Sequence, residues 1–116
     1  MIISIQREKL INPLKQMVGV SEKKQTMPIL GNVLLRSEGG LLLLVSSDLE
    51  VEVSTLIAYE TEEGVDTTLP TRKFLDILKS LPGSDLVDIE ISETKATIKS
   101  GRSKFTLATI PGSEFP

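Results

Sequence analysis

Residues 26–54 constrain the fold most, because they predict three consecutive antiparallel strands with very little chain between them. The predicted strands are residues 29–36, 41–46 and 50–58. Glu38-Gly39-Gly40 supplies the positive φ angles of a tight hairpin, and Ser46-Ser47-Asp48 favours a turn through local side-chain hydrogen bonds. Residues 41–45 are all apolar. We therefore expect the middle strand to be buried on both faces, or covered by helices on one face and strands on the other.

Two segments outside this stretch have the periodicity of amphipathic helices, residues 7–18 and residues 72–81. Their apolar stripes are Leu10, Leu14, Met17 and Val18 in the first segment and Phe74, Leu75, Leu78 and Leu81 in the second. Pro13 predicts that the first helix is short or kinked, and Gly19 is its expected end. Thr71 is the expected N-cap of the second helix.

Short β-branched segments around these helices predict the remaining strands. They are residues 1–6, 65–70, 86–92, 95–100 and 103–110. The order strand, helix, three strands thus occurs twice along the chain, although the two halves share few identical residues. We expect one α+β domain, residues 1–116, built from two pseudo-symmetric β-α-β-β-β units with both helices on one face of a curved antiparallel sheet.

The residue types that the chain lacks exclude several kinds of chemistry. Its 116 residues include neither His nor Cys, so the usual zinc sites and histidine-dependent nucleophilic catalysis are excluded. No glycine-rich phosphate loop is present. We therefore expect no catalytic residues, no metal and no cofactor. The lack of cysteine is compatible with a cytoplasmic location, and no apolar run approaches the length of about 18 residues that a membrane span needs.

The charges are distributed unevenly, although the net charge is only −3. Residues 1–30 carry five Lys or Arg against two Asp or Glu (+3), residues 31–70 one against eight (−7), and residues 71–116 seven against six (+1). Positive charge therefore gathers on the two helices and the loop after the first, while the hairpins are acidic. If the helices share one face, that face attracts a polyanion; the alternative is that these lysines only solvate their helices.

The few aromatic side chains limit what such a face can recognise. One Tyr and three Phe leave little for stacking on single strands or flipped bases, and no helix is rich in the Asn, Gln and Arg that read base edges. We expect any nucleic-acid binding to use phosphates, without sequence preference, and to weaken as salt rises.

Four short motifs, in the same order and spacing throughout, resemble the bacterial DNA polymerase III β subunit, the sliding clamp. They are TMPILGNVLL at residues 26–35, SDLEVE at 47–52, PTRKF at 70–74 and SGRSKF at 100–105. Chains of that family are about three times longer and contain three domains of one fold. The resemblance implies that this chain is the first domain only, with the second and third absent.

The resemblance also implies a function. Two such subunits close head to tail into a ring, the DNA-clamp or processivity fold, which encircles duplex DNA with its helices inside and tethers the replicative polymerase. Lys24 and Arg72 are the best matches to basic positions of the family, and Lys15, Lys23 and Lys79 are weaker ones. Lys24 replaces an arginine common at that position, which keeps the charge and loses bidentate geometry. The expected location is the bacterial cytoplasm, at the nucleoid during replication.

Self-association is the second implied role. In clamps the last strand of this domain pairs with the third domain of the partner subunit to form the homodimer. By similarity, the contributing residues are Lys73, Ile77, Leu81, Arg102, Lys104, Phe105 and Leu107. The alternative is that Ile77, Phe105 and Leu107 are ordinary core residues. Ile77 lies to one side of the stripe formed by Phe74 and Leu78, and this favours the interface.

Two rival functions remain open. Asp48, Glu50 and Glu52 resemble the carboxylates of a metal-dependent enzyme, although a solvated hairpin with a polar outer face explains them better. A peptide-binding module is the other rival, but in the family the pocket for polymerase and clamp-loader peptides lies on the second and third domains. We therefore expect those partners to bind mainly outside this chain, and we expect no membrane partner.

Overall fold

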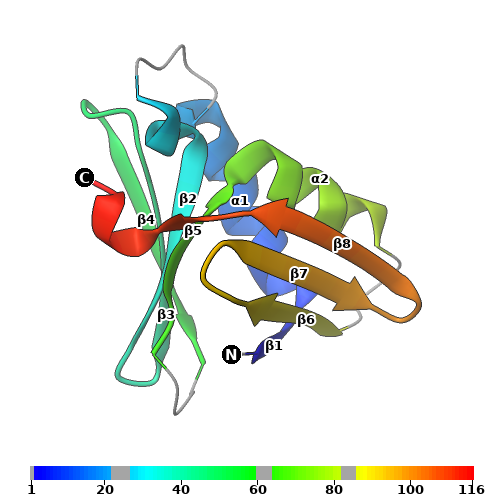
Figure 1. The fold of residues 1–116 in the computed structure, drawn as a ribbon. Helices are drawn as coiled ribbons and strands as arrows, with labels where there is room; N and C mark the ends of the chain where they lie inside the picture. Colours follow the sequence, from blue (N-terminus) through cyan, green and yellow to red (C-terminus); the bar gives the residue numbers. More distant parts are fainter. Residues whose placement is uncertain (1, 22–26, 60–63, 82–85) are drawn as a thin grey trace.

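Two α-helices pack against two antiparallel sheets in the part of the chain that the computed structural model describes, residues 2–21, 27–59, 64–81 and 86–116 (Figure 1). In chain order the elements are β1 (Ile2–Gln6), α1 (Arg7–Ser21), the 3₁₀ helix η1 (Pro28–Gly31), β2 (Asn32–Glu38), β3 (Leu41–Ser47), β4 (Glu52–Ala58), β5 (Asp66–Pro70), α2 (Thr71–Ser80), β6 (Leu86–Ile91), β7 (Lys95–Ser100), β8 (Ser103–Ala108), β9 (Ile110–Pro111) and the 3₁₀ helix η2 (Gly112–Glu114). Neither α-helix among these residues is long and apolar enough to cross a membrane.

The sheet is divided into a four-stranded part, in the order β1-β6-β7-β8, and a five-stranded part, in the order β4-β3-β2-β5-β9. The α+β class and the repeated strand–helix–three-strand pattern are confirmed, and the single curved sheet is replaced by two sheets. β8 and β9 are separated by one residue and belong to different sheets, so the end of the chain joins the two (Figure 1).

The two repeated units exchange their first strands. β1 leaves its own unit and pairs with β6, with Ile3 opposite Ile89, while β5 pairs with β2 of the first unit, with Leu35 opposite Thr67. Each sheet therefore contains strands from both halves of the sequence. Because neither half has a complete sheet without the other, the two units fold as one domain.

One hydrophobic core lies between the helices and the sheets. Both predicted helical stripes are buried in it, and α1 adds Ile11, which the periodicity missed. Strand side chains alternate between this core and the outer surface; on β1, for example, Ile3 and Ile5 are buried while Ser4 between them is exposed. Phe74 at the centre is fully buried, and each large side chain buried here contributes roughly 1.5–3 kcal/mol.

Several predicted boundaries are corrected. α1 runs through Pro13 and past Gly19 to Ser21, because burial of its apolar stripe outweighs the roughly 3 kcal/mol that an internal proline costs. Thr71 is not the cap of α2 but its first residue, since Pro70 occupies the cap position. Residues 28–31, which begin with a proline, form a turn of 3₁₀ helix before β2 starts at Asn32.

The strand of continuous leucines is also less buried than predicted. Leu42 and Leu44 of β3 are fully buried against the helices, but Leu41 on the opposite face is 37% exposed and Leu43 is half-buried. The outer face of the five-stranded sheet is thus partly open along β3. Its neighbour β4 is an edge strand and exposes Leu56 on the same face, where Leu56 is the partner of Leu43.

The course of α1 through Gly19 generates a test of stability. Gly19→Ala should raise the free energy of unfolding by about 0.5–1 kcal/mol, because the position is helical and an added Cβ meets no atom within 4 Å. Gly101→Ala is the matched control, since its Cβ also meets nothing but its φ is +58°; it should lower stability by roughly 1 kcal/mol. Urea unfolding followed by circular dichroism measures both, and a destabilised Gly19→Ala variant would show that α1 ends earlier.

Candidate nucleic-acid interface

The two helices lie antiparallel and are joined by polar contacts at both ends. At one end the Arg7 guanidinium of α1 donates to the Leu78 carbonyl of α2 at 2.9 Å. At the other end the hydroxyls of Ser21 and Thr71 lie 3.0 Å apart. The start of α1 is therefore held beside the end of α2, and the end of α1 beside the start of α2. This arrangement puts side chains from distant parts of the sequence on one helical surface.

A groove of about 340 Å³ runs between the helices on this surface. Its lining residues are Arg7, Glu8, Ile11, Asn12, Lys15 and Lys79. Arg7, Ile11 and Lys15 are spaced four residues apart and form one stripe of α1, which faces Lys79 near the end of α2. Three cations against one carboxylate give the groove a local charge of +2. Such a surface attracts an anionic backbone.

The second helix extends the cationic surface toward the other end. Arg72 and Lys79 are both exposed and lie seven residues apart on one stripe of α2, with Asp76 between them. The Nε atom of Arg72 lies 3.4 Å from Oδ1 of Asp76, and both side chains are more than half exposed. An exposed pair of this kind contributes little to stability, so Arg72 can exchange Asp76 for another anion at small cost.

The predicted DNA-binding residues are only partly brought together by these elements. Lys15 and Lys79 lie in the groove, and Arg72 lies on the same stripe of α2 as Lys79. Lys23 and Lys24 lie outside the described residues. Sequence reasoning overlooked Arg7, although its spacing to Ile11 and Lys15 was a signal that could have found it.

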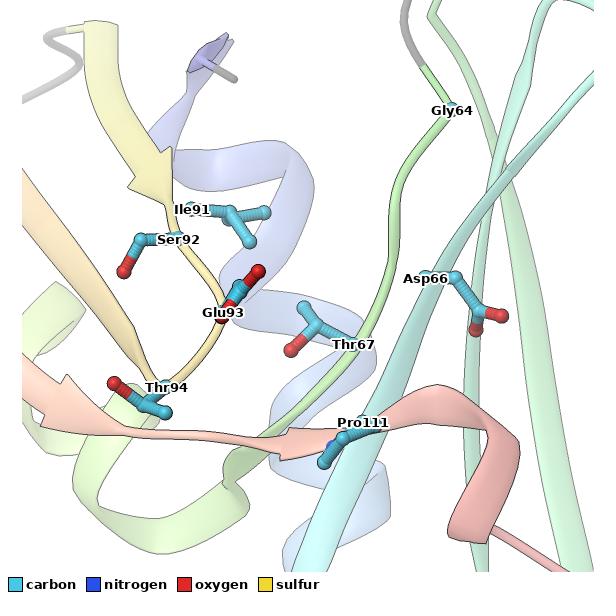
Figure 2. A pocket seen from close by; sticks show the side chains of 8 residues that line it. All are labelled: Gly64, Asp66, Thr67, Ile91, Ser92, Glu93, Thr94 and Pro111. Carbon is cyan, nitrogen blue, oxygen red and sulfur yellow. The ribbon is translucent and has the colours of Figure 1, made fainter.

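A larger hollow of about 710 Å³ lies between the two sheets, where strand and turn residues line it (Figure 2). It is lined by Gly64, Asp66, Thr67, Ile91, Ser92, Glu93, Thr94 and Pro111. Thr67 of β5 points toward the β6–β7 turn, whereas Asp66 turns away to bind Arg36 of β2 (Figure 2). Among its described lining residues are two carboxylates and no Lys or Arg, so this hollow repels a polyanion despite its size.

The comparisons with known proteins agree with this geometry. The family model for the N-terminal domain of the DNA polymerase III β subunit matches residues 1–116. The chain belongs to this family. The β sliding clamp of Pseudomonas aeruginosa is 48% identical over the whole chain, and that of Escherichia coli K12 is 38% identical. The chain spans about a third of the length of these relatives, 32% in both cases.

Solved clamp structures have the same fold. The P. aeruginosa sliding clamp bound to griselimycin superimposes with a TM-score of 0.91, at 48% identity, over 100% of this chain and 32% of that one. The Caulobacter crescentus polymerase III β structure gives a TM-score of 0.90 at 30% identity, over 100% and 32% of the two chains. The clamp fold expected from the sequence is therefore confirmed, and these relatives do not support the metal-enzyme or peptide-module alternatives.

The charged residues predicted for the subunit interface are exposed around the edge strand β8. Lys73 lies on α2, Arg102 lies in the turn before β8, and Lys104 lies on β8 itself. Among the described residues, β8 has a partner strand only on its β7 side. At the opposite edge of the same sheet, the Ser4 N–H of β1 already donates to the Tyr59 hydroxyl at 2.9 Å. β8 is thus the more available of the two edges for pairing with another chain.

The apolar residues predicted for the same interface are largely part of the core. Ile77 is 9% exposed, Leu107 is 8% exposed, and Leu81 is buried with them. The reasoning that separated Ile77 from the core stripe is wrong, because the core reaches around that side of α2. Phe105 is half-buried and packs against the core while part of it stays accessible. The interface role of these residues stays a prediction, with Phe105 offering the most free apolar surface.

One carboxylate of the rival metal site, that of Asp48, has a structural role in the β3–β4 turn. Oδ1 of Asp48 accepts the backbone N–H groups of Glu50 and Val51 at 2.9 and 2.7 Å, and the Ser47 hydroxyl accepts that of Leu49 at 3.0 Å. These bonds hold Leu49 at a φ of 77°, a conformation that leucine rarely adopts. No group of three or more Asp, Glu, His or Cys suited to a metal occurs among the described residues.

This turn generates a prediction that separates a structural role of Asp48 in the turn from a role as a metal ligand. Asp48→Ala should lower the free energy of unfolding by about 1–2 kcal/mol, because two backbone donors lose their acceptor. Glu50→Ala, whose side chain is exposed, is the control and should leave stability nearly unchanged. Urea unfolding with and without 10 mM MgCl₂ measures both. A stabilisation by Mg²⁺ that Glu50→Ala abolishes would instead favour a metal site.

Proposed function

We propose that the chain is the first domain of a sliding clamp, a non-catalytic subunit that encircles duplex DNA and tethers the replicative polymerase for processivity. One observation carries the proposal: an antiparallel helix pair exposes Lys15, Arg72 and Lys79 on its surface and holds the half-buried Arg7 at the edge of the same groove. The acidic hairpins are formed by strands and do not belong to this helix pair. The relatives named above support this assignment, since the curated ones are β sliding clamps.

The chemistry of the helix surface suits a DNA duplex that has to slide along it. Lys and Arg hold phosphates at any position along a duplex, and this attraction carries no sequence information. The surface offers no aromatic side chain for stacking and few groups for reading base edges. Binding of this kind is weak at each contact, so processivity comes from enclosure by the ring. We propose Lys24 and Arg72 as the main phosphate contacts, with Lys15, Lys23 and Lys79 contributing less.

The isolated domain should bind duplex DNA weakly and in a salt-dependent way. We expect a dissociation constant on the order of 10⁻⁴ M at low salt, whose logarithm changes with log salt by about 0.9 for each phosphate contacted. Arg72→Glu should weaken binding about tenfold and reduce that slope by about 1. Lys24→Glu combined with Arg72→Glu should abolish measurable binding. Fluorescence anisotropy of labelled 20-base-pair duplexes across a salt series measures each quantity.

The matched control is Lys95→Glu, the same charge reversal at an exposed position of β7. Its neighbour Ala96 points into the core, so Lys95 lies on the sheet face away from the helices. This variant should bind nearly as well as the unmodified chain. Equal losses for Lys95→Glu and Arg72→Glu, or binding that depends on sequence and not on salt, would contradict the proposal.

The second role that we propose is subunit assembly through β8. An edge strand flanked by Lys73, Arg102 and Lys104 fits the acidic edge of another domain, and a homodimeric ring would follow in the longer protein. Clamp loader and polymerases would then bind mainly to the other domains. Such a protein would act in the bacterial cytoplasm, at the replicating nucleoid.

The free edge of β8 should make the isolated chain self-associate at high concentration. Pairing across β7 and β8 alternates from the Gly101-Arg102 turn onward, which directs the Thr106 N–H toward the free side. Thr106→Pro removes that donor and should raise the dissociation constant of the associated species about tenfold. Thr106→Ala, which loses the same side chain but keeps the N–H, is the control. Sedimentation equilibrium measures both, and an equal effect of the two variants would place the contact elsewhere.

A further inference from the structure

Three buried hydroxyls connect the two helices to the five-stranded sheet. The Oγ atoms of Ser21, at the end of α1, and Ser46, on β3, lie 2.7 Å apart. Oγ of Ser21 lies 3.0 Å from Oγ1 of Thr71, the first residue of α2, and Ser46 Oγ lies 3.3 Å from the Met17 carbonyl. Ser46 and Thr71 are fully buried and Ser21 nearly so. Water therefore does not compete for these bonds.

Each hydroxyl has only one proton, and this fixes the direction of the whole chain of bonds. The Met17 carbonyl can only accept a hydrogen bond, so the Ser46 hydroxyl donates its proton to that carbonyl. Ser21 must then donate to Ser46, and Thr71 must donate to Ser21. The protons all point from the start of α2 toward α1. Cooperative polarisation strengthens hydrogen bonds that are aligned in this way.

The direction also matches the charges at the helix ends. This chain of hydrogen bonds ends on the Met17 carbonyl near the C-terminus of α1, where the helix dipole is negative and attracts a donated proton. The series of hydrogen bonds begins at Thr71, at the N-terminus of α2, where the helix dipole is positive and favours the lone pairs of the Thr71 oxygen. Reversing the bonds would oppose both dipoles. The three hydroxyls thus specify one relative position of the two helix ends, which apolar side chains of the same size would not do.

We infer that the hydroxyls of Ser21, Ser46 and Thr71 are positioning groups for the cationic surface. Thr71 is followed directly by Arg72, so the bond that fixes the first turn of α2 also fixes the direction from which Arg72 leaves the helix. The same bond holds Ser21 at the end of α1, close in sequence to Lys23 and Lys24. This inference rests on the proposed binding of phosphates by that surface.

Thr71→Val tests the inference, because it keeps the size and shape of the side chain and removes the first donor. We expect about threefold weaker binding of a 20-base-pair duplex at low salt, and Thr71→Ser should restore it. In an Arg72→Glu background, Thr71→Val should have no further effect. Thr68→Val is the matched control, since Thr68 is also fully buried and its hydroxyl, outside the helix pair, donates to the Ile110 carbonyl at 2.8 Å and accepts from the Asn32 amide at 3.0 Å. It should be destabilised at least as much and bind DNA normally.

A measurement without DNA keeps the inference separate from the proposed function. In ¹⁵N NMR spectra the Nε–Hε signal of Arg72 should shift in Thr71→Val and stay unchanged in Thr68→Val and Thr71→Ser. If the unmodified chain shows no salt-dependent binding, or Arg72→Glu has no effect, the proposed function fails while this signal still decides the positioning role. An unshifted signal, or a binding loss in Thr71→Val that Thr68→Val matches or that persists in the Arg72→Glu background, would overturn the inference.

Discussion

The apolar faces of α1 and α2 can be buried in only one place, against the inner faces of the two sheets, and this constraint determines the rest of the structure. Once Leu14 and Phe74 occupy that space, the stripe of α1 beside its core face and the outer stripe of α2 lie at the surface together. The cations on those stripes thus come to share one surface without any attraction between them. Hydrophobic burial, worth far more than exposed ion pairs, therefore places the charges that the proposed function needs.

The exchange of first strands between the two units makes this arrangement cooperative. Because β1 pairs with β6 and β5 pairs with β2, each helix is anchored to a sheet that contains strands of both units. Moving one helix therefore disturbs strands of the other half. The Arg7 bond to the Leu78 carbonyl and the three buried hydroxyls then determine the relative position of the helix ends. Burial sets which surface is cationic, and directional bonds set how its side chains are spaced.

Sequence periodicity could predict the elements but not the contacts between them. The stripes at Leu10 and Phe74 identified both helices and their buried faces, because a 3.6-residue period reflects burial directly. The same reasoning failed for Ile77, since how far the core reaches around α2 depends on which elements pack beside it. Gly19 was misread for a related reason: glycine ends helices only where the backbone needs a positive φ, and tertiary contacts carry α1 past it.

The same difference between elements and contacts applies to the prediction of the candidate site. Lys15, Arg72 and Lys79 were predicted from the family resemblance and lie on the surface of the helix pair, whereas Arg7 was overlooked although its spacing to Ile11 and Lys15 is visible in the sequence. The division of the sheet into two parts also could not be predicted, since it depends on the pairing of β9 with β5 after a single intervening residue. Motif resemblance supplied the family, while the positions of the charges required the packed helices.

The carboxylates within the cationic surface also have a physical role. Glu8 lines the groove beside Arg7, and Asp76 lies between Arg72 and Lys79, so four described cations are offset by two anions. A surface of four unopposed cations would hold phosphates more tightly and give each bound position a deeper energy minimum. A duplex moves along a surface only by leaving one set of contacts for the next, so shallow minima favour movement. In the ring that we propose, enclosure would retain the DNA, so the loss of affinity caused by Glu8 and Asp76 would lower the barrier to sliding without releasing the duplex.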